Sequence, residues 1–256
     1  MTDLSGWVPP LVLALAPGGV KLWIDRSLAR RLDDPALPER LMARRSRMAM
    51  VVAVPLAVTV LLWPARLPWS GPLLIAAFVA AGFPLRRRLH GETWSLPSYL
   101  WFMLRWTVAT WGFWLLLVCA PVLADRAGWQ GWAAAGAVAA VLLSWNERFA
   151  DVLRFAARAR PVDRPDLLVR FEALVARTQL ATPRFDEVPL RGGVVANALA
   201  LPSVGGAGVL FTETLLNRFT ADEVTAVCAH ELAHLEYFNP ERVRRMRLRG
   251  ALLILV

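Results

Sequence analysis

Residues 220–237 read TADEVTAVCAHELAHLEY, and this stretch decides how the C-terminal part of the chain folds. Thr220 is followed three residues later by Glu223, which is the spacing of a capping box that satisfies two backbone donors at the start of a helix. Residues 221–237 contain neither Gly nor Pro, and Pro240 follows soon after them. The pattern therefore predicts a helix over 221–237 that ends or bends before Pro240.

The same helix carries His230, Glu231 and His234. Side chains four residues apart lie on one helix face one turn apart, so both imidazoles can bind a single metal ion. Glu231 adjoins the first of them and can accept a proton from zinc-bound water, whose pKa the ion lowers to about 7. Two of the three His in the chain fall within this pattern. We therefore predict one Zn²⁺ per chain, with His230 and His234 as metal ligands and Glu231 as the catalytic base.

A catalytic zinc site of this kind needs a third protein ligand. Glu236 lies two residues past His234 and points off the metal-binding face. Glu241 lies nearly two turns past His234, too far to reach the metal unless the chain folds back at Pro240. Residues 250–256 begin another apolar run, about 10 Å long as a helix. The expectation is a longer protein whose third ligand lies beyond residue 256.

Five apolar runs precede this region, at residues 7–24, 48–63, 72–85, 99–123 and 130–145. The whole chain is 57% hydrophobic, with a mean hydropathy of +0.45. The run at 99–123 is comfortably longer than the ~20 residues that cross a bilayer as a helix. The shorter runs at 48–63 and 72–85 form either two tight spans or one re-entrant hairpin. We expect an N-terminal membrane region over 1–146 with about five spans, followed by a cytoplasmic linker over 147–164.

Connections rich and poor in cations alternate between these runs. Residues 21–47 carry eight cations, 86–88 are three Arg and 148–160 carry four Arg, whereas residues 1–6 carry none. Positive charge beside apolar spans marks the cytoplasmic side of a membrane, so we expect everything after residue 145 to lie in the cytoplasm. The expected location is the inner (plasma) membrane of a bacterium. The net charge of +9 has the same explanation, and nucleic acid is not an expected partner because no aromatic-basic binding pattern accompanies the cations.

Residues 165–249 have the patterns of a small mixed domain. An amphipathic helical pattern covers 166–179, and a helical turn is expected at 214–218. Short β-branched or apolar segments bounded by Pro and Gly predict three strands, at 184–188, 194–201 and 209–212. We expect an α+β domain over 165–249, partial in this chain, with residues 250–256 starting a further apolar span.

The motifs NALALP at 197–202, GVLFT at 208–212 and HELAH at 230–234 resemble those of the membrane zinc metallopeptidase family of the CAAX prenyl protease and the HtpX heat-shock protease. The resemblance implies a membrane α-helical bundle followed by an α+β zincin-like (gluzincin) peptidase domain, with the C-terminal part missing from this chain. Leu199 stands where the family usually has Phe, and the family's downstream Glu ligand has no match here.

The resemblance also implies which residues bind substrate. They lie on the strand that contains the NALALP motif and on the edge strand that follows it, which contains GVLFT. These residues are Asn197, Ala198, Val209, Leu210 and Phe211. An edge strand offers free N–H and C=O groups that can hold an extended peptide.

The function expected from these features is that of a membrane-bound zinc metalloendopeptidase that hydrolyses peptides or membrane proteins at the cytoplasmic face. Its partners would be the peptide or membrane-protein substrate and the lipid bilayer. Two alternatives stay open: a sensor-transducer receptor of the β-lactam-sensing type with a cytoplasmic zinc peptidase domain, and an inactive membrane scaffold.

Overall fold

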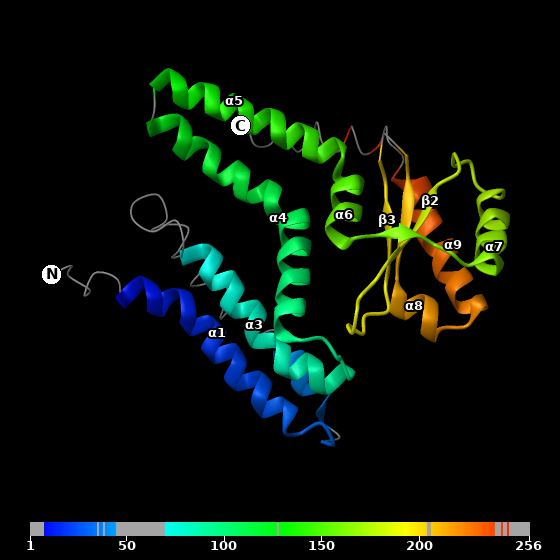
Figure 1. Ribbon diagram of the computed structural model, residues 1–256, viewed down its shortest axis with the longest axis horizontal. Helices are drawn as coiled ribbons and strands as arrows, with labels where there is room; N and C mark the ends of the chain where they lie inside the picture. The colour runs from blue at the N-terminus through cyan, green and yellow to red at the C-terminus, as the bar shows by residue number, and fades with distance from the viewer. Residues whose placement is uncertain are drawn as a thin grey trace. The chain divides into compact units, whose positions relative to one another are not determined.

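In the computed structural model the chain divides into two compact units, Met1–Leu104 and Arg105–Val256. The structure describes residues 8–34, 36, 37, 39–44, 70–126, 128–203, 206–238, 242 and 245. The first unit is helical and the second combines helices with a small sheet (Figure 1).

The first unit is built on two helices that lie side by side, α1 (Val8–Ala29) and α3 (Ser70–His90) (Figure 1). Gly18 permits their close approach, because a Cβ at this position would lie 3.0 Å from backbone atoms of Ala77. Leu28, Ala29 and Leu85 form a small buried cluster between the two helices near their Arg-rich ends.

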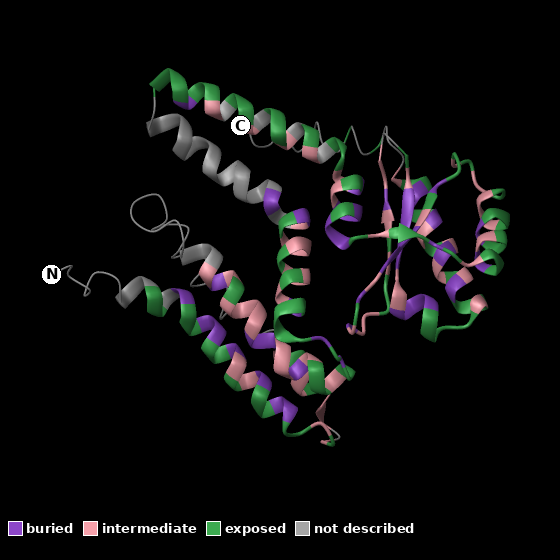
Figure 2. Cartoon of the chain, in the orientation of Figure 1, coloured by how far each residue is buried: buried purple, intermediate pink, exposed green. Residues whose placement is uncertain are grey.

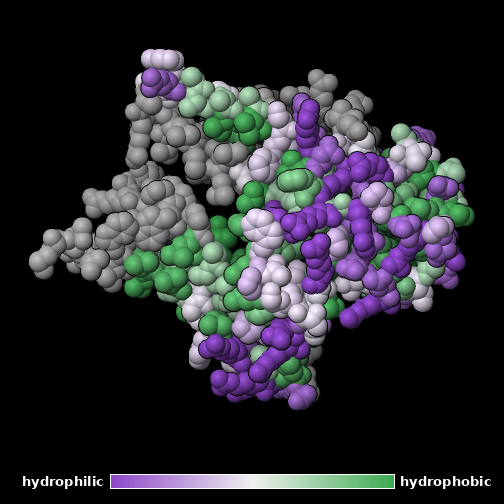
Figure 3. Space-filling view, viewed as in Figure 1, coloured by the Kyte–Doolittle hydropathy of each residue, from purple (hydrophilic) through white to green (hydrophobic). Residues whose placement is uncertain are grey.

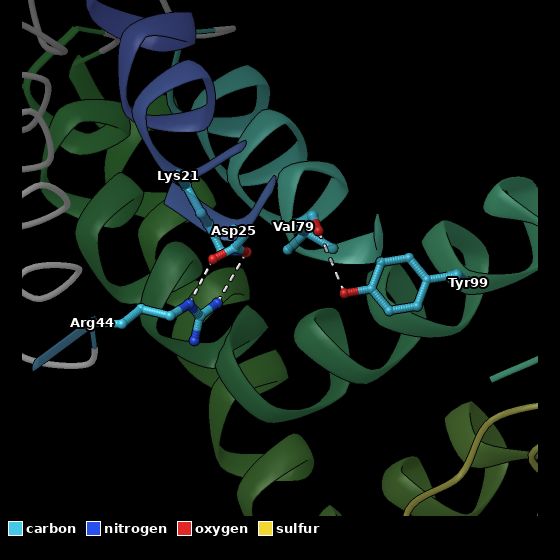
Figure 4. A network of polar contacts seen from close by, with 5 residues as sticks. All are labelled: Lys21, Asp25, Arg44, Val79 and Tyr99. Atoms are coloured by element: carbon cyan, nitrogen blue, oxygen red, sulfur yellow. Dashed lines mark hydrogen bonds and ion pairs between the residues drawn. The ribbon is translucent and has the colours of Figure 1, made fainter. Parts of the chain in front are cut away.

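A buried carboxylate joins α1 to the helical residues 39–44. Asp25 is fully buried and accepts hydrogen bonds from Lys21 Nζ (2.5 Å) and from Arg44 Nε (2.5 Å) and Nη2 (3.0 Å), as Figure 4 shows. In the same view the Tyr99 hydroxyl donates to the Val79 carbonyl at 3.4 Å. Burying a charge is costly unless it is paired and hydrogen-bonded. The bonds from Lys21 and Arg44 offset this cost for Asp25 and connect the two helical segments.

The predicted apolar runs at 7–24 and 72–85 correspond to α1 and α3. Those at 99–123 and 130–145 correspond to α4 (Leu96–Arg126) and α5 (Gly128–Glu147), whereas the run at 48–63 lies outside the described residues. Trp145 Nε1 on α5 donates to the Ala109 carbonyl on α4 at 3.3 Å. The N-terminal region is therefore helical, as predicted.

By length, hydropathy and charge, none of the helices within the described ranges is able to span a membrane.

The second unit contains a four-stranded sheet with the order β1-β2-β4-β3. β2 (Arg184–Val188) and β4 (Gly208–Thr212) are parallel, whereas β1 (Arg160–Pro161) and β3 (Ala198–Leu201) run antiparallel to their neighbours. Within the described residues, β1 and β3 are therefore the two edges of the sheet.

Among the helices that accompany the sheet are α7 (Pro165–Val175), α8 (Glu213–Arg218) and α9 (Ala221–Tyr237). Strand β4, most of β2 and the inner faces of these helices are the buried parts of this region (Figure 2). At the centre of the core, Phe171 of α7 stacks on Phe211 of β4, with ring centroids 5.2 Å apart. The prediction of an α+β region is confirmed.

The segment 147–164, expected to be a linker, is partly folded. It contains α6 (Phe149–Ala157) and β1, and Arg154 of α6 pairs with the buried carboxylate of Asp186 on β2 at 2.8 Å. The linker prediction is wrong for these residues, because an ion pair and a strand pairing attach them to the sheet. Two other predicted elements are longer than the observed ones: the helix over 166–179 ends at Val175, and the strand over 194–201 starts at Ala198.

Hydrophilic side chains cover much of the visible face of the α+β region in Figure 3. The side chains of Arg160 and Arg184, on the first two strands, are 61% and 60% exposed.

Candidate metal centre and peptide-binding edge

Helix α9 begins and ends where the sequence predicts. The Thr220 hydroxyl accepts from the Glu223 N–H, and the Glu223 carboxylate accepts from the Thr220 N–H at 2.8 Å, so the capping box is complete. Its buried stripe consists of residues three or four positions apart: Val224, Cys228, Leu232 and Leu235. This stripe packs into the core and leaves the other faces of α9 free for polar side chains.

His230 and His234 lie on the exposed side of α9, and their rings converge. Their Nε2 atoms are 3.1 Å apart, and the two rings are nearly perpendicular at 88°, with centroids 4.6 Å apart. With Zn–N bonds of 2.0–2.1 Å, a tetrahedral ion holds two ligand nitrogens about 3.3 Å apart. The two imidazoles thus fit a shared zinc ion with little movement.

The third ligand is not found in the described part of the chain, where no three His, Cys, Asp or Glu side chains are grouped to hold a metal ion. Glu236 accepts a hydrogen bond from the Gln179 N–H at 3.0 Å, which agrees with the prediction that it points off the metal-binding face. Glu241 and residues 250–256 lie outside the described residues.

Glu231 connects α9 to β3. Its Oε2 accepts a hydrogen bond from the backbone N–H of Ala200 at 2.7 Å, and the residue is half-buried. The Cβ atoms of Ala198 and Ala200 pack against the core cluster that includes the buried stripe of α9. Because these side chains are small, α9 approaches β3 closely enough for a carboxylate to reach its backbone.

The backbone of β3 divides its hydrogen-bonding groups between β4 and the open edge. Asn197 is paired with Thr212, whose N–H donates to the Asn197 carbonyl at 3.0 Å, and the register continues with Leu199 opposite Leu210. In an antiparallel ladder, hydrogen-bonded and non-hydrogen-bonded residue pairs alternate. The backbone groups of Ala198 and Ala200 therefore point away from β4, towards the open edge.

The side chain of Thr212 fixes the start of this edge. The Asn197 N–H donates to Thr212 Oγ1 at 2.9 Å, and the same hydroxyl donates to the Asn197 carbonyl at 3.1 Å. The backbone of Asn197 thus bonds to Thr212 next to the start of β3, and the residue is exposed.

The structure corrects the expected position of Val209, Leu210 and Phe211. They lie on β4, which pairs with β2 on one side and β3 on the other, and their exposures are 1%, 3% and 0%. Their predicted position on an edge strand is wrong, because crossover order puts β4 inside the sheet. Their backbone groups are used by neighbouring strands, and β3 carries the edge that faces α9.

Sequence reasoning did not single out Ala200. A signal was present in the alternation Ala198-Leu199-Ala200, since small residues two apart on a strand indicate a face approached closely by another element.

Cys228 belongs to the buried stripe of α9. Burial, with a further contribution from Glu231, raises the pKa of its thiol to about 12. Cys228 is therefore a protonated core residue beneath the site.

Comparison with known families agrees with the resemblance noted in the sequence. Residues 161–253 match the family model Peptidase_M48, peptidase family M48. This is the family that includes the CAAX prenyl protease and HtpX. No curated protein and no solved structure matches the chain.

Proposed function

Residues 161–253 belong to peptidase family M48, and we propose that the chain is a zinc metalloendopeptidase whose substrate binds as an extended strand along β3. The observation that carries this proposal is the convergence of His230 and His234, with Nε2 atoms 3.1 Å apart, beside a carboxylate that reaches the sheet edge. These residues would hold the metal and the base within one rigid helix and next to the peptide.

Each residue has a chemical role in this proposal. A bound zinc ion would polarise the scissile carbonyl and a water molecule. Glu231 would take the proton of the attacking water and deliver it to the leaving amine. The N–H and C=O of Ala198, which face the open edge, would pair with the substrate backbone, and the exposed side chain of Asn197 would contact it further.

A third ligand remains part of the proposal, and it would come from outside the described residues. Glu241 lies there, and its distance along the chain from His234 disfavours it. If Glu241→Ala retains the zinc stoichiometry of the wild type, Glu241 is excluded as this ligand.

The proposal extends to a bacterial inner membrane. It is supported by the apolar runs of the sequence and by the alternation of Arg-rich connections between them. The peptidase region would then face the cytoplasm, where peptides or membrane proteins would be its substrates. Extraction of membranes with alkaline carbonate tests the location: release of the full chain into the supernatant would exclude an integral membrane protein.

Cleavage of casein by the full chain in detergent, with and without zinc, tests the activity. We expect zinc-dependent cleavage by the wild type and a loss of at least about a hundredfold in Glu231→Ala, the minimum typical of losing a general base. Glu236→Ala is the matched control, since it removes a carboxylate from the same helix that bonds to Gln179. Equal cleavage by the wild type and Glu231→Ala would remove Glu231 as the base. A lack of cleavage by zinc-loaded wild type would favour the inactive-scaffold alternative.

A further inference from the structure

The hydrogen bond between Glu231 and Ala200 uses a group that an extended peptide also needs. Ala198 and Ala200 are the β3 residues whose backbone groups point to the open edge, because Leu199 and Leu201 face β4 in the ladder. A peptide strand added to this edge would accept from the N–H of Ala198 and, two residues further along, from the N–H of Ala200. In the free protein the second of these donors is already bound to Glu231 at 2.7 Å.

We infer that the Ala200 N–H is a shared site, which holds the Glu231 carboxylate in the free protein and a substrate carbonyl in the complex. This inference rests on the proposed peptidase function, since it concerns the base and the binding edge of that site. The two acceptors exclude each other, because one N–H at the edge of a sheet donates one strong, well-aligned hydrogen bond. Pairing of the peptide along β3 would therefore release Glu231 towards His230 and His234, where the reaction takes place.

The exchange of acceptors at the Ala200 N–H requires few changes elsewhere in the structure. Glu231 is half-buried, and Ala200 is its hydrogen-bond partner in the described part of the chain, so the exchange breaks one hydrogen bond of the carboxylate. Ala200 stays fixed during the exchange, because Leu199 and Leu201 remain paired with Leu210 and Gly208. Substrate binding and positioning of the base would be coupled through a single donor.

Exchange of backbone amide hydrogens, followed by NMR on the zinc-free full chain in detergent, tests the free state. We expect the Ala200 amide to exchange at least about tenfold more slowly than the Ala198 amide, since the first is hydrogen-bonded and the second faces solvent. Glu231→Ala should remove this protection, and Glu231→Gln should keep it, because the amide oxygen of Gln also accepts. Adding the capped peptide acetyl-Ala-Val-Ala-Leu-Ala-Val-amide should protect both amides. Equal exchange at Ala200 in the wild type and Glu231→Ala would overturn the inference.

The affinity of the same uncharged peptide tests the competition. In zinc-free protein, Glu231→Ala should bind it about 3- to 10-fold more tightly than the wild type, which is the value of one net hydrogen bond freed from a competitor. Ala200→Pro removes the shared N–H and should abolish this gain. Ala198→Pro is the matched control: it removes the neighbouring edge N–H, weakens binding, and should leave the gain from Glu231→Ala intact.

Pro at an outward-facing edge position leaves the ladder bonds in place, so both Pro variants are expected to fold. The hydrogen-exchange measurement needs neither of them. The inference of a shared donor fails if Glu231→Ala does not increase the affinity for the peptide. It also fails if Glu231→Ala increases this affinity equally in the Ala200→Pro background. Since no cleavage is measured, an inactive wild type would contradict the proposed function while leaving this double-mutant comparison valid.

Discussion

Two carboxylates, one in each unit of the chain, are hydrogen-bonded in opposite ways. In the helical unit, Asp25 is fully buried and receives three hydrogen bonds from Lys21 and Arg44. In the α+β unit, Glu231 is half-buried and receives one, from a backbone donor at the edge of the sheet. The comparison teaches that a saturated carboxylate fixes structure, whereas a carboxylate with spare acceptor capacity beside two converging imidazoles is available for chemistry.

The largest expected effect lies in the core on which the second unit depends. Phe211→Ala should destabilise the α+β region by about 3–5 kcal/mol, because it opens a cavity beside Phe171. Chemical denaturation followed by circular dichroism measures the loss. Leu199→Ala, on the neighbouring strand but with 36% exposure, is the control and should cost far less. A small effect of Phe211→Ala on stability, with weaker peptide binding, would restore the substrate role that its buried position argues against.

The difference between the carboxylates of Asp25 and Glu231 is tested most directly by a substitution of Asp25. Asp25→Ala should cost roughly 3 kcal/mol, since Lys21 is left buried without its partner, while Arg44 is partly exposed and can be rehydrated. Thermal unfolding in detergent provides the measurement. Asp34→Ala, which removes a more exposed pair with Arg40, should change stability by about 1 kcal/mol or less. Glu231→Ala should resemble Asp34→Ala in stability while losing activity, and a large loss of stability there would contradict the distinction between the two carboxylates.

A smaller effect is expected at the start of the metal-binding helix. Thr220→Ala removes the side-chain cap of α9 and should cost about 1 kcal/mol. Thr225→Ala lies on the same helix and removes a hydroxyl that donates back to the Ala221 carbonyl, a bond that adds little to a helix. Urea denaturation should therefore separate the two Thr variants, and equal midpoints would show that the capping box does not stabilise α9.

The smallest effect is the pH dependence of that cap. The Thr220 N–H and hydroxyl donate to the Glu223 carboxylate and lower its pKa below the ordinary value of 4.5. Since the folded pKa is depressed, the stabilisation is fully present above about pH 4.5 and disappears as the pH falls through the folded value. Denaturation midpoints measured from pH 6 down to pH 3 should fall slightly more for the wild type than for Glu223→Gln. Parallel curves would show that this carboxylate makes no difference to the folded state.

Much of the second unit could be predicted because its signals are local. The bounds of α9 follow from Thr220 and from the absence of Gly and Pro, and β2 coincides with the predicted residues 184–188. The convergence of His230 and His234 follows from helix geometry alone, since a spacing of four residues brings the two side chains together.

The remaining features depend on contacts distant in sequence. The position of β4 inside the sheet comes from a crossover order that no local pattern encodes. The role of the Ala200 N–H depends on the register of β3 against β4, which decides the direction in which each backbone group points. α6 was not predicted, and its attachment to the sheet rests on a buried pair between Arg154 and Asp186, 32 residues apart.

The open edge of β3 also bears on the solubility of the protein. A bare strand edge can join the same edge of another copy, which leads to aggregation. β3 has only four residues, and the carboxylate of Glu231 occupies one of the N–H groups that a second copy would need. Charged side chains on short edge strands are known to oppose such self-association. The proposed catalytic residue Glu231 would therefore also oppose the association of copies that have no substrate bound.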